Sequence, residues 1–187
     1  MVQASDPADA DRVVAFMPRS IHMDSSRKGK AVEQLIGALC VLGSKGELNA
    51  WTSLVDDEGV DLVVQRREHP ETIAVQVKAR LTTAKGIAER QRFQSGVRKQ
   101  TLRPRSDLYM LFVVANPETL DVGPIWLIPS KKFARLAPVG GAKKRHKFVA
   151  SAKHGTADKW SPFLVDKTDL PGELLAALRQ ESRRRRG

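Results

Sequence analysis

Hydrophobic and polar residues alternate most regularly between residues 73 and 80 of the chain. A period of two residues predicts a β-strand in which Gln76 and Lys78 share one face. Their Cα atoms would lie about 6.6 Å apart at the usual rise along a strand. The apolar run 60–65 predicts a second strand, and the polar segment 66–71 can turn the chain between the two.

A helix is predicted before this hairpin, because apolar residues recur there at helical spacing up to Cys40 and Leu42. Ser25 or Ser26 can cap its start, and a glycine at 43 ends it. Segment 82–100 is polar and basic and predicts a helix or a mobile arm. The remaining expected elements are strands at 48–55, 108–115 and 125–128, a turn at 56–59, and helices at 6–17, 130–136 and from Asp169 onward.

The order of these elements predicts a single α/β domain: a helix, a three-stranded antiparallel meander, a helix, and further strands in a mixed sheet. We expect residues 1–23 to form an N-terminal appendage and residues 24–137 to form the core. Residues 138–187 would add a flexible basic loop, a terminal helix and a disordered Arg-rich tail that pack on or extend the same domain.

Charge is unevenly distributed along the 187 residues, whose formal net charge is +11. Segments 66–105 and 131–187 carry 26 of the 32 lysines and arginines, with only 8 of the 21 acidic residues. Such segregation is typical of proteins that bind a phosphate backbone. A merely basic, soluble surface is the alternative interpretation.

Several classes of function lack support in the sequence. The single cysteine, Cys40, lies in the apolar stripe of the first helix and fits a core position, and one cysteine excludes an internal disulfide. We therefore expect a cytoplasmic protein, with no membrane segment because no apolar stretch approaches 18 residues. The four histidines lack zinc-site spacing, and neither a nucleophile elbow nor a P-loop motif is present. The three tryptophans, Trp51, Trp126 and Trp160, are expected to be core or sheet-packing residues rather than to stack on bases.

The two predicted strands bring together a carboxylate, an amide and an ammonium group. Asp61 begins the first strand, and opposed residues of an antiparallel hairpin share a face, so Asp61 would lie near Gln76 or Lys78. These groups can form a metal site, although an ordinary cross-strand ion pair between Asp61 and Lys78 is the alternative. Glu33 falls at the edge of the apolar stripe on the first helix, where it can face the site or be a solvated residue near the helix start.

This pattern resembles the PD-(D/E)xK nuclease superfamily, in the Gln-x-Lys branch that includes Mrr-like restriction endonucleases. Asp61 matches the first acidic position, Gln76 the second, Lys78 the lysine, and Glu33 the helix glutamate of many members. Val60 replaces the proline of the motif name, and Gln76 replaces an acid, which removes one negative charge from the site. The resemblance implies a restriction-endonuclease-like core between about residues 29 and 128.

The resemblance implies a Mg²⁺-dependent or Mn²⁺-dependent DNA endonuclease that leaves 5′-phosphate and 3′-hydroxyl ends. Asp61 and Gln76, with Glu33 in support, would hold the metal, and Lys78 would assist the attacking water or stabilise the phosphate. The expected partner is double-stranded DNA, and a homodimer would let two sites act on two strands. The alternatives are a non-catalytic nucleic-acid-binding module on the same fold, a junction-specific nuclease, or an RNA nuclease.

Basic residues near the predicted site and in the expected loop at 138–147 are candidates for contact with the DNA backbone. These candidates are Lys28, Lys30, Arg80, Lys85, Arg90, Arg92, Lys143, Lys144, Arg145 and Lys147.

Overall fold

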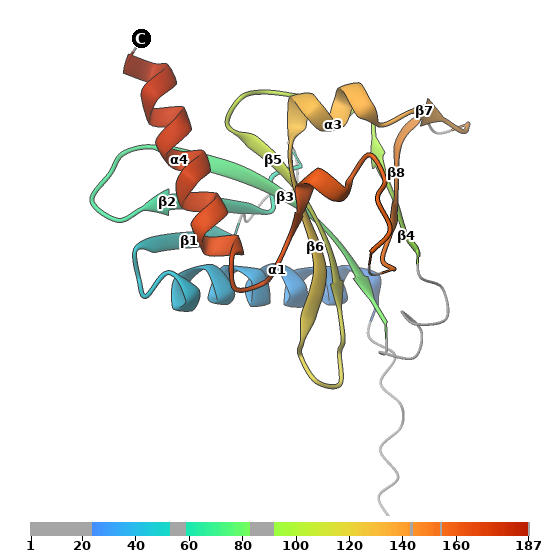
Figure 1. Cartoon of the computed structure of the whole chain (residues 1–187), viewed down its shortest axis with the longest axis horizontal. Helices are drawn as coiled ribbons and strands as arrows, with labels where there is room; N and C mark the ends of the chain where they lie inside the picture. The colour runs from blue at the N-terminus through green and yellow to red at the C-terminus, as the bar shows by residue number, and fades with distance from the viewer. Residues whose placement is uncertain (1–23, 53–58, 83–91, 143, 154, 187) are drawn as a thin grey trace, which may run out of the picture.

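The computed structural model describes residues 24–52, 59–82, 92–142, 144–153 and 155–186 (Figure 1). Its helices are α1 (Ser25–Gly43), α3 (Ser130–Leu136), the 3-10 turn η2 (Ser161–Phe163) and α4 (Leu170–Arg186). Its strands are β1 (Leu48–Thr52), β2 (Leu62–Arg66), β3 (Thr72–Leu81), β4 (Arg92–Arg98), β5 (Leu108–Ala115), β6 (Val122–Pro129), β7 (Val139–Gly140), β8 (Arg145–Ser151) and β9 (Leu164–Val165). The helix predicted at 6–17 and residues 56–58 of the turn predicted at 56–59 lie outside the described residues.

A six-stranded mixed sheet forms the centre of the molecule, in the order β1-β2-β3-β5-β6-β9. Strands β1, β2 and β3 form an antiparallel meander, as predicted, and β3 then pairs in parallel with β5. Strands β6 and β9 continue the sheet with antiparallel pairing. Every residue of β5 is buried, which agrees with the continuous apolar run that predicted a central strand.

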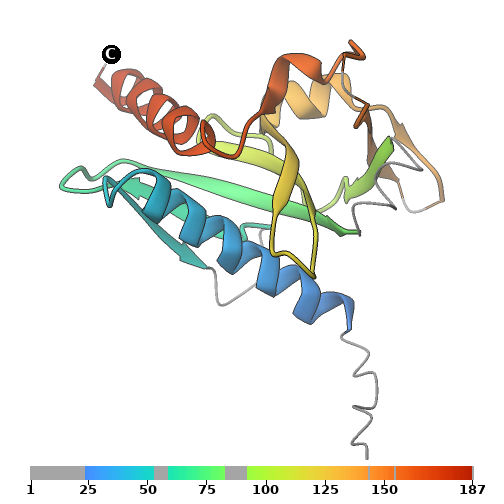
Figure 2. The same cartoon turned by 60° about the horizontal axis from the view of Figure 1, so that its bottom comes forward.

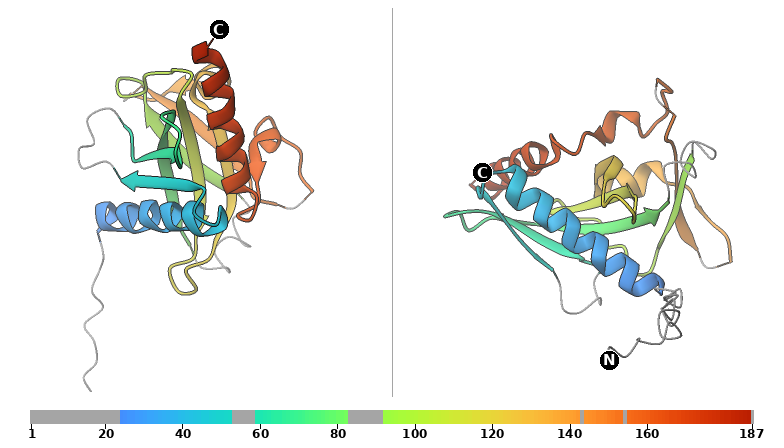
Figure 3. Two further views of the ribbon diagram at one scale, coloured as in Figure 1. Left: turned by 90° about the vertical axis from the view of Figure 1, so that its left-hand side faces the viewer. Right: turned by 90° about the horizontal axis from the view of Figure 1, so that it is seen from below.

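Helices α1 and α4 pack on one face of this sheet, and Figure 3 shows them crossing on the same side of it. Their apolar residues join one core cluster with Ile73, Val75 and Val77 of β3. In Figure 2, α1 runs along the long strand β3. Cys40 is fully buried in this cluster, as predicted, and burial raises the pKa of its thiol to about 12.

A second core cluster lies on the opposite face of the sheet and joins it to a smaller sheet of order β4-β8-β7. Phe112 of β5 and Phe148 of β8 stack with ring centroids 3.8 Å apart, so they connect the two sheets directly. Trp126 and Trp160 are buried in the same cluster, as predicted. Of the two positions predicted for Trp51, the core is excluded, because its side chain is 47% exposed on β1 at the edge of the main sheet.

Residues 92–98 form strand β4, not the helix or arm predicted for 82–100. Phe93 and Val97 are both buried and lie four residues apart, a spacing that suits one helical turn or two strand repeats equally well. Pairing with β8, about fifty residues later in the chain, decides in favour of a strand.

Residues 138–147 are also more ordered than the predicted flexible loop, because 139–140 and 145–151 form β7 and β8. The C-terminal tail is helical rather than disordered, since α4 extends to Arg186. Glu181 stabilises this last part of α4 through ion pairs with Arg184 and Arg185 at 3.6 and 3.8 Å.

Near the N-terminal end of the described chain, the side chain of Asp24 caps α1, rather than either of the predicted serines. Its carboxylate accepts a hydrogen bond from the backbone N–H of Arg27 at 2.8 Å. No helix among the described residues is both long enough and apolar enough to cross a bilayer.

Candidate active site

Asp61 is fixed beside the middle of β3, directly before β2 begins. Its backbone N–H donates a hydrogen bond to the carbonyl oxygen of Val75 at 3.0 Å. Its carboxylate oxygen Oδ2 accepts a hydrogen bond from the backbone N–H of Val77 at 2.7 Å, a short distance typical of a charged acceptor. Asp61 is only 7% exposed, so these bonds offset part of the cost of its burial. Val75 and Val77, on either side of Gln76, are therefore both hydrogen-bonded to Asp61.

The buried Gln76 side chain lies against a glycine two residues before Asp61. Gly59 has a φ of +68°, which favours glycine, and a Cβ placed there would lie 2.4 Å from Nε2 of Gln76. The carboxamide nitrogen is the nearer end, because Oε1 would be 3.7 Å from that Cβ. The main chain at 59–61 thus forms one wall of the space that holds the Gln76 amide.

Lys78 lies on the same face of β3 as Gln76, away from the two large helices. Val75 and Val77 belong to the core cluster under α1 and α4, and alternate side chains of a strand point to opposite faces. Gln76 and Lys78 therefore face the layer that contains the second sheet. Lys78 is half-buried and lies opposite Phe112 in the parallel pairing of β3 with β5.

Glu33 lies in the helix layer, on the other face of the sheet from Gln76 and Lys78. It is 9% exposed and sits in the third turn of α1, so it is not a solvated residue at the helix start. Its Oε2 atom lies 2.7 Å from Nζ of Lys30, with which it forms an ion pair. The structure therefore brings residues 59–61 together with 75–77, whereas Glu33 is engaged with its own helix.

Within the described part of the chain, a metal ion at this site would have few acidic ligands. Among the described residues, no group of three or more His, Cys, Asp or Glu side chains is arranged to hold a metal ion. The oxygen donors around residue 76 are the Asp61 carboxylate, the Gln76 amide and the Val77 carbonyl. Mg²⁺ often takes only one or two carboxylates and keeps several waters, and a carboxylate has room for more than one partner. The residues present therefore fit a weakly held, partly hydrated Mg²⁺ or Mn²⁺ ion.

The candidate DNA-binding residues are distributed over several elements. Lys28 and Lys30 lie on the first turns of α1, and Arg80 near the end of β3 donates a hydrogen bond to the Gln94 carbonyl of β4 at 2.6 Å. The others that are described lie on the second sheet or its turn, namely Arg92, Lys144, Arg145 and Lys147. Lys85, Arg90 and Lys143 lie outside the described residues.

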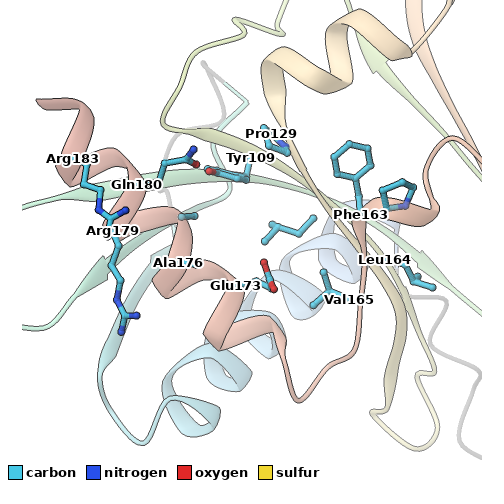
Figure 4. A pocket seen from close by; sticks show the side chains of 13 residues that line it. Tyr109, Pro129, Phe163, Leu164, Val165, Glu173, Ala176, Arg179, Gln180 and Arg183 are labelled. Carbon is cyan, nitrogen blue, oxygen red and sulfur yellow. The ribbon is translucent and has the colours of Figure 1, made fainter. Parts of the chain in front are cut away.

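A pocket of about 650 Å³ opens elsewhere, between α4 and strands β6 and β9 (Figure 4). Tyr109 lines it and is paired in register with Val75, so it belongs to the helix face of the sheet. Burial raises the pKa of the Tyr109 hydroxyl. This pocket is therefore separate from the face that carries Gln76 and Lys78.

The sequence analysis did not single out Gly59 or the backbone N–H of Val77. A glycine two residues before an acidic strand position was visible in the sequence. Its close approach to Gln76 depends on the fold of the hairpin, which local patterns do not specify.

No protein-family model matches the sequence, and the search of curated proteins gave no significant match. Solved structures that are similar include two nucleases. A bacterial homing endonuclease, I-Ssp6803I, has a TM-score of 0.50 and 16% sequence identity, covering 85% of this chain and 97% of its own. Hjc, a Holliday junction resolvase from the archaeal hyperthermophile Archaeoglobus fulgidus, has a TM-score of 0.38 and 12% identity, covering 71% of this chain and 96% of its own.

The likeness to the homing endonuclease concerns the fold, because so low an identity carries no residue roles with it. The assignment to the Gln-x-Lys branch stays a prediction. The mixed sheet flanked by helices confirms the restriction-endonuclease-like fold expected from the sequence.

Proposed function

We propose that this chain is a metal-dependent endonuclease that hydrolyses phosphodiester bonds of double-stranded DNA. The observation that carries the proposal is the buried Asp61 carboxylate, hydrogen-bonded at 2.7 Å to the strand that presents Gln76 and Lys78. The fold shared with a homing endonuclease supports it. In the reaction, a water oxygen attacks phosphorus and the bond to the 3′ oxygen breaks, leaving 5′-phosphate and 3′-hydroxyl ends.

Each residue has a separate task in this proposal. Asp61 and Gln76 would hold Mg²⁺ or Mn²⁺ together with the Val77 carbonyl, and the bound ion makes a coordinated water easier to deprotonate. The Lys78 ammonium group orients the attacking water or stabilises negative charge on the phosphate. A homodimer would place two such sites on the two strands of a duplex.

Nicking of a supercoiled plasmid with Mg²⁺ or Mn²⁺ tests this function. We expect wild-type protein to convert the plasmid to open-circle or linear forms, and Lys78→Ala to abolish conversion while binding at low salt persists. Exposed Lys45→Ala, at the far end of the described sheet, is the matched control and should cleave normally. Equal cleavage by Lys78→Ala and wild type would refute the role of this site.

A non-catalytic nucleic-acid-binding module is the second candidate, and one observation favours it. Gln76 replaces an acid, and no acidic cluster is arranged for metal among the described residues. This candidate predicts DNA binding with no cleavage at any Mg²⁺ or Mn²⁺ concentration. Gln76→Glu separates the two candidates further, because the added carboxylate should tighten Mn²⁺ binding in calorimetry if residue 76 is a ligand.

A further inference from the structure

The small sheet β4-β8-β7 has a basic outer face. Phe93 and Val97 of β4 and Phe148 of β8 point into the core, so the alternate residues point outward. Neither β4, β7 nor β8 contains an acidic residue. The outward positions carry four cations: Arg92, Arg98, Arg145 and Lys147.

In the part of the chain that the structure describes, none of these four cations forms an ion pair with a carboxylate. Arg92, Arg98 and Lys147 are exposed, so their charge is open to solvent. Arg145 is half-buried, and its buried Nε has no hydrogen-bond partner among the described residues.

Glycines on the neighbouring strands let two of these side chains lie along the sheet. A Cβ at Gly96 of β4 would lie 3.1 Å from Cδ of Arg145, and one at Gly140 of β7 would lie 3.3 Å from Nζ of Lys147. Arg145 and Lys147 thus pass over strands that have no side chain at those positions. The outer face is therefore positively charged and has few projecting side chains, so a bulky polymer can approach it closely.

One hydrogen bond links this sheet to the strand that carries the candidate active site. Arg80 follows Lys78 on the same face of β3, and its guanidinium donates to the carbonyl of Gln94 on β4 at 2.6 Å. At the opposite end of β4, the backbone N–H of Lys99 donates to the carbonyl of Lys144 at 3.1 Å. Arg98, Lys99 and Lys144 there line a shallow recess.

We infer that the outer face of β4-β8-β7 binds the sugar–phosphate backbone of duplex DNA, with Arg92, Arg98, Arg145 and Lys147 as the phosphate contacts. The inference rests on the proposed function, because it names the surface that would hold that site's substrate. Strand β4 spans about 20 Å from Arg92 to Arg98, which is the rise of about six phosphates of one strand measured along the duplex axis. A duplex fits better than a single strand, since the aromatic rings of β4 and β8 are buried and cannot stack on bases.

Binding of a labelled duplex without divalent metal, measured by fluorescence anisotropy from 50 to 200 mM salt, tests this inference. Arg145→Gln combined with Lys147→Gln should weaken binding by roughly 10- to 100-fold at 50 mM salt. It should also reduce the slope of log K against log salt by about 2, since each phosphate contact contributes about 0.9. The matched control, Arg179→Gln combined with Arg183→Gln, removes the same charge from exposed positions on α4. Figure 1 shows α4 at the other end of the molecule, and the control should keep the wild-type slope.

The outcomes separate this inference from the proposed function. Equal slopes for the two double variants, no duplex binding by wild type, or preference for a single strand would overturn the inference. If Arg145→Gln/Lys147→Gln binds and nicks like wild type, the surface is wrong and the nuclease proposal stands. If the double variant loses duplex binding but wild type never nicks a plasmid, the surface is right and the catalytic proposal fails.

Discussion

Gly59 is the residue whose replacement most directly tests the geometry around Gln76. Alanine there would be strained at a φ of +68° and would place a methyl group 2.4 Å from the Gln76 amide. We expect Gly59→Ala to lower the free energy of unfolding by about 1–2 kcal/mol and plasmid nicking by at least about tenfold, the loss expected for displaced active-site groups. Denaturant unfolding and the nicking assay measure the two effects.

Gly46 provides the control for that substitution. It has a similar φ of +79°, but a Cβ there would meet nothing within 4 Å. Gly46→Ala should therefore lose similar stability and keep full nicking activity. Equal activity losses in the two variants would show that backbone strain, rather than contact with Gln76, is responsible.

Asp61 combines a structural hydrogen bond with the proposed catalytic charge, and two substitutions separate these roles. Asp61→Asn keeps an oxygen that can accept from Val77, whereas Asp61→Ala leaves that buried N–H without its partner. We expect Asp61→Ala to cost about 1–3 kcal/mol of unfolding free energy and Asp61→Asn to cost less. Both should abolish nicking; full activity in Asp61→Asn would rule out a role for the charge.

The sequence predicted which strand face carries Gln76 and Lys78 better than it predicted the contacts that hold the site residues in place. Alternation along 73–80 placed Gln76 and Lys78 on one face, since a strand has a fixed period of two. The same reasoning could not show that Gly59 packs on Gln76, because that contact depends on how segments separated in the chain come together. The pair of Lys30 and Glu33 is different: it joins residues three apart on one helix, a local spacing that the sequence contained.

Helix α1 contributes a cysteine whose burial has a measurable consequence. Because burial raises the pKa of Cys40 to about 12, the folded protein keeps this thiol protonated at pH 8. We expect negligible reaction with a thiol reagent until the protein unfolds. The folded state binds this proton more tightly than the unfolded chain, so its contribution to stability is complete below pH 9 and declines as pH rises above it. Rapid labelling at pH 8 under native conditions would contradict the burial of Cys40.

Strand β8 depends on Phe148 for its attachment to the main sheet. This ring is fully buried and stacks on Phe112 at 3.8 Å. Phe148→Ala should lower the free energy of unfolding by about 3–5 kcal/mol and speed hydrogen exchange in β4 and β8 before the rest of the core. Val149→Ala, at a half-buried position of the same strand, should cost much less. Similar losses would show that the stacked rings do not hold the second sheet.

The second sheet was the part of the fold that local patterns described least well. Apolar residues four apart at Phe93 and Val97 suit either period, and Gly140 with the lysines that follow suggests a loop. The pairing of β4 with β8 links segments about fifty residues apart. Such distant pairings determine these strands, whereas the meander of β1, β2 and β3 follows from adjacent segments and was predicted correctly.

At the scale of the whole molecule, lysines lie at both of its ends, so their reactivity can report which end binds DNA. Lys45 lies in the turn between α1 and β1. At the opposite end of the main sheet, Lys147 lies on β8 of the second sheet and Lys144 in the turn before it (Figure 1). If the second sheet is the docking face, bound duplex should shield Lys144 and Lys147 from amine acetylation and leave Lys45 reactive. Mass spectrometry of peptides from free and DNA-bound protein measures this difference, and uniform protection would argue against one preferred face.

The pairing of β3 has a consequence for how any substrate would be accommodated. This strand is joined to β5 in register from residue 74 to residue 81, and to β2 through residues 72–75. Gln76 and Lys78 lie beyond the pairing with β2 and are held by β5 and by the Asp61–Val77 hydrogen bond. The strand sets the spacing of these two side chains, so a substrate phosphate would meet two groups at a separation fixed before it binds.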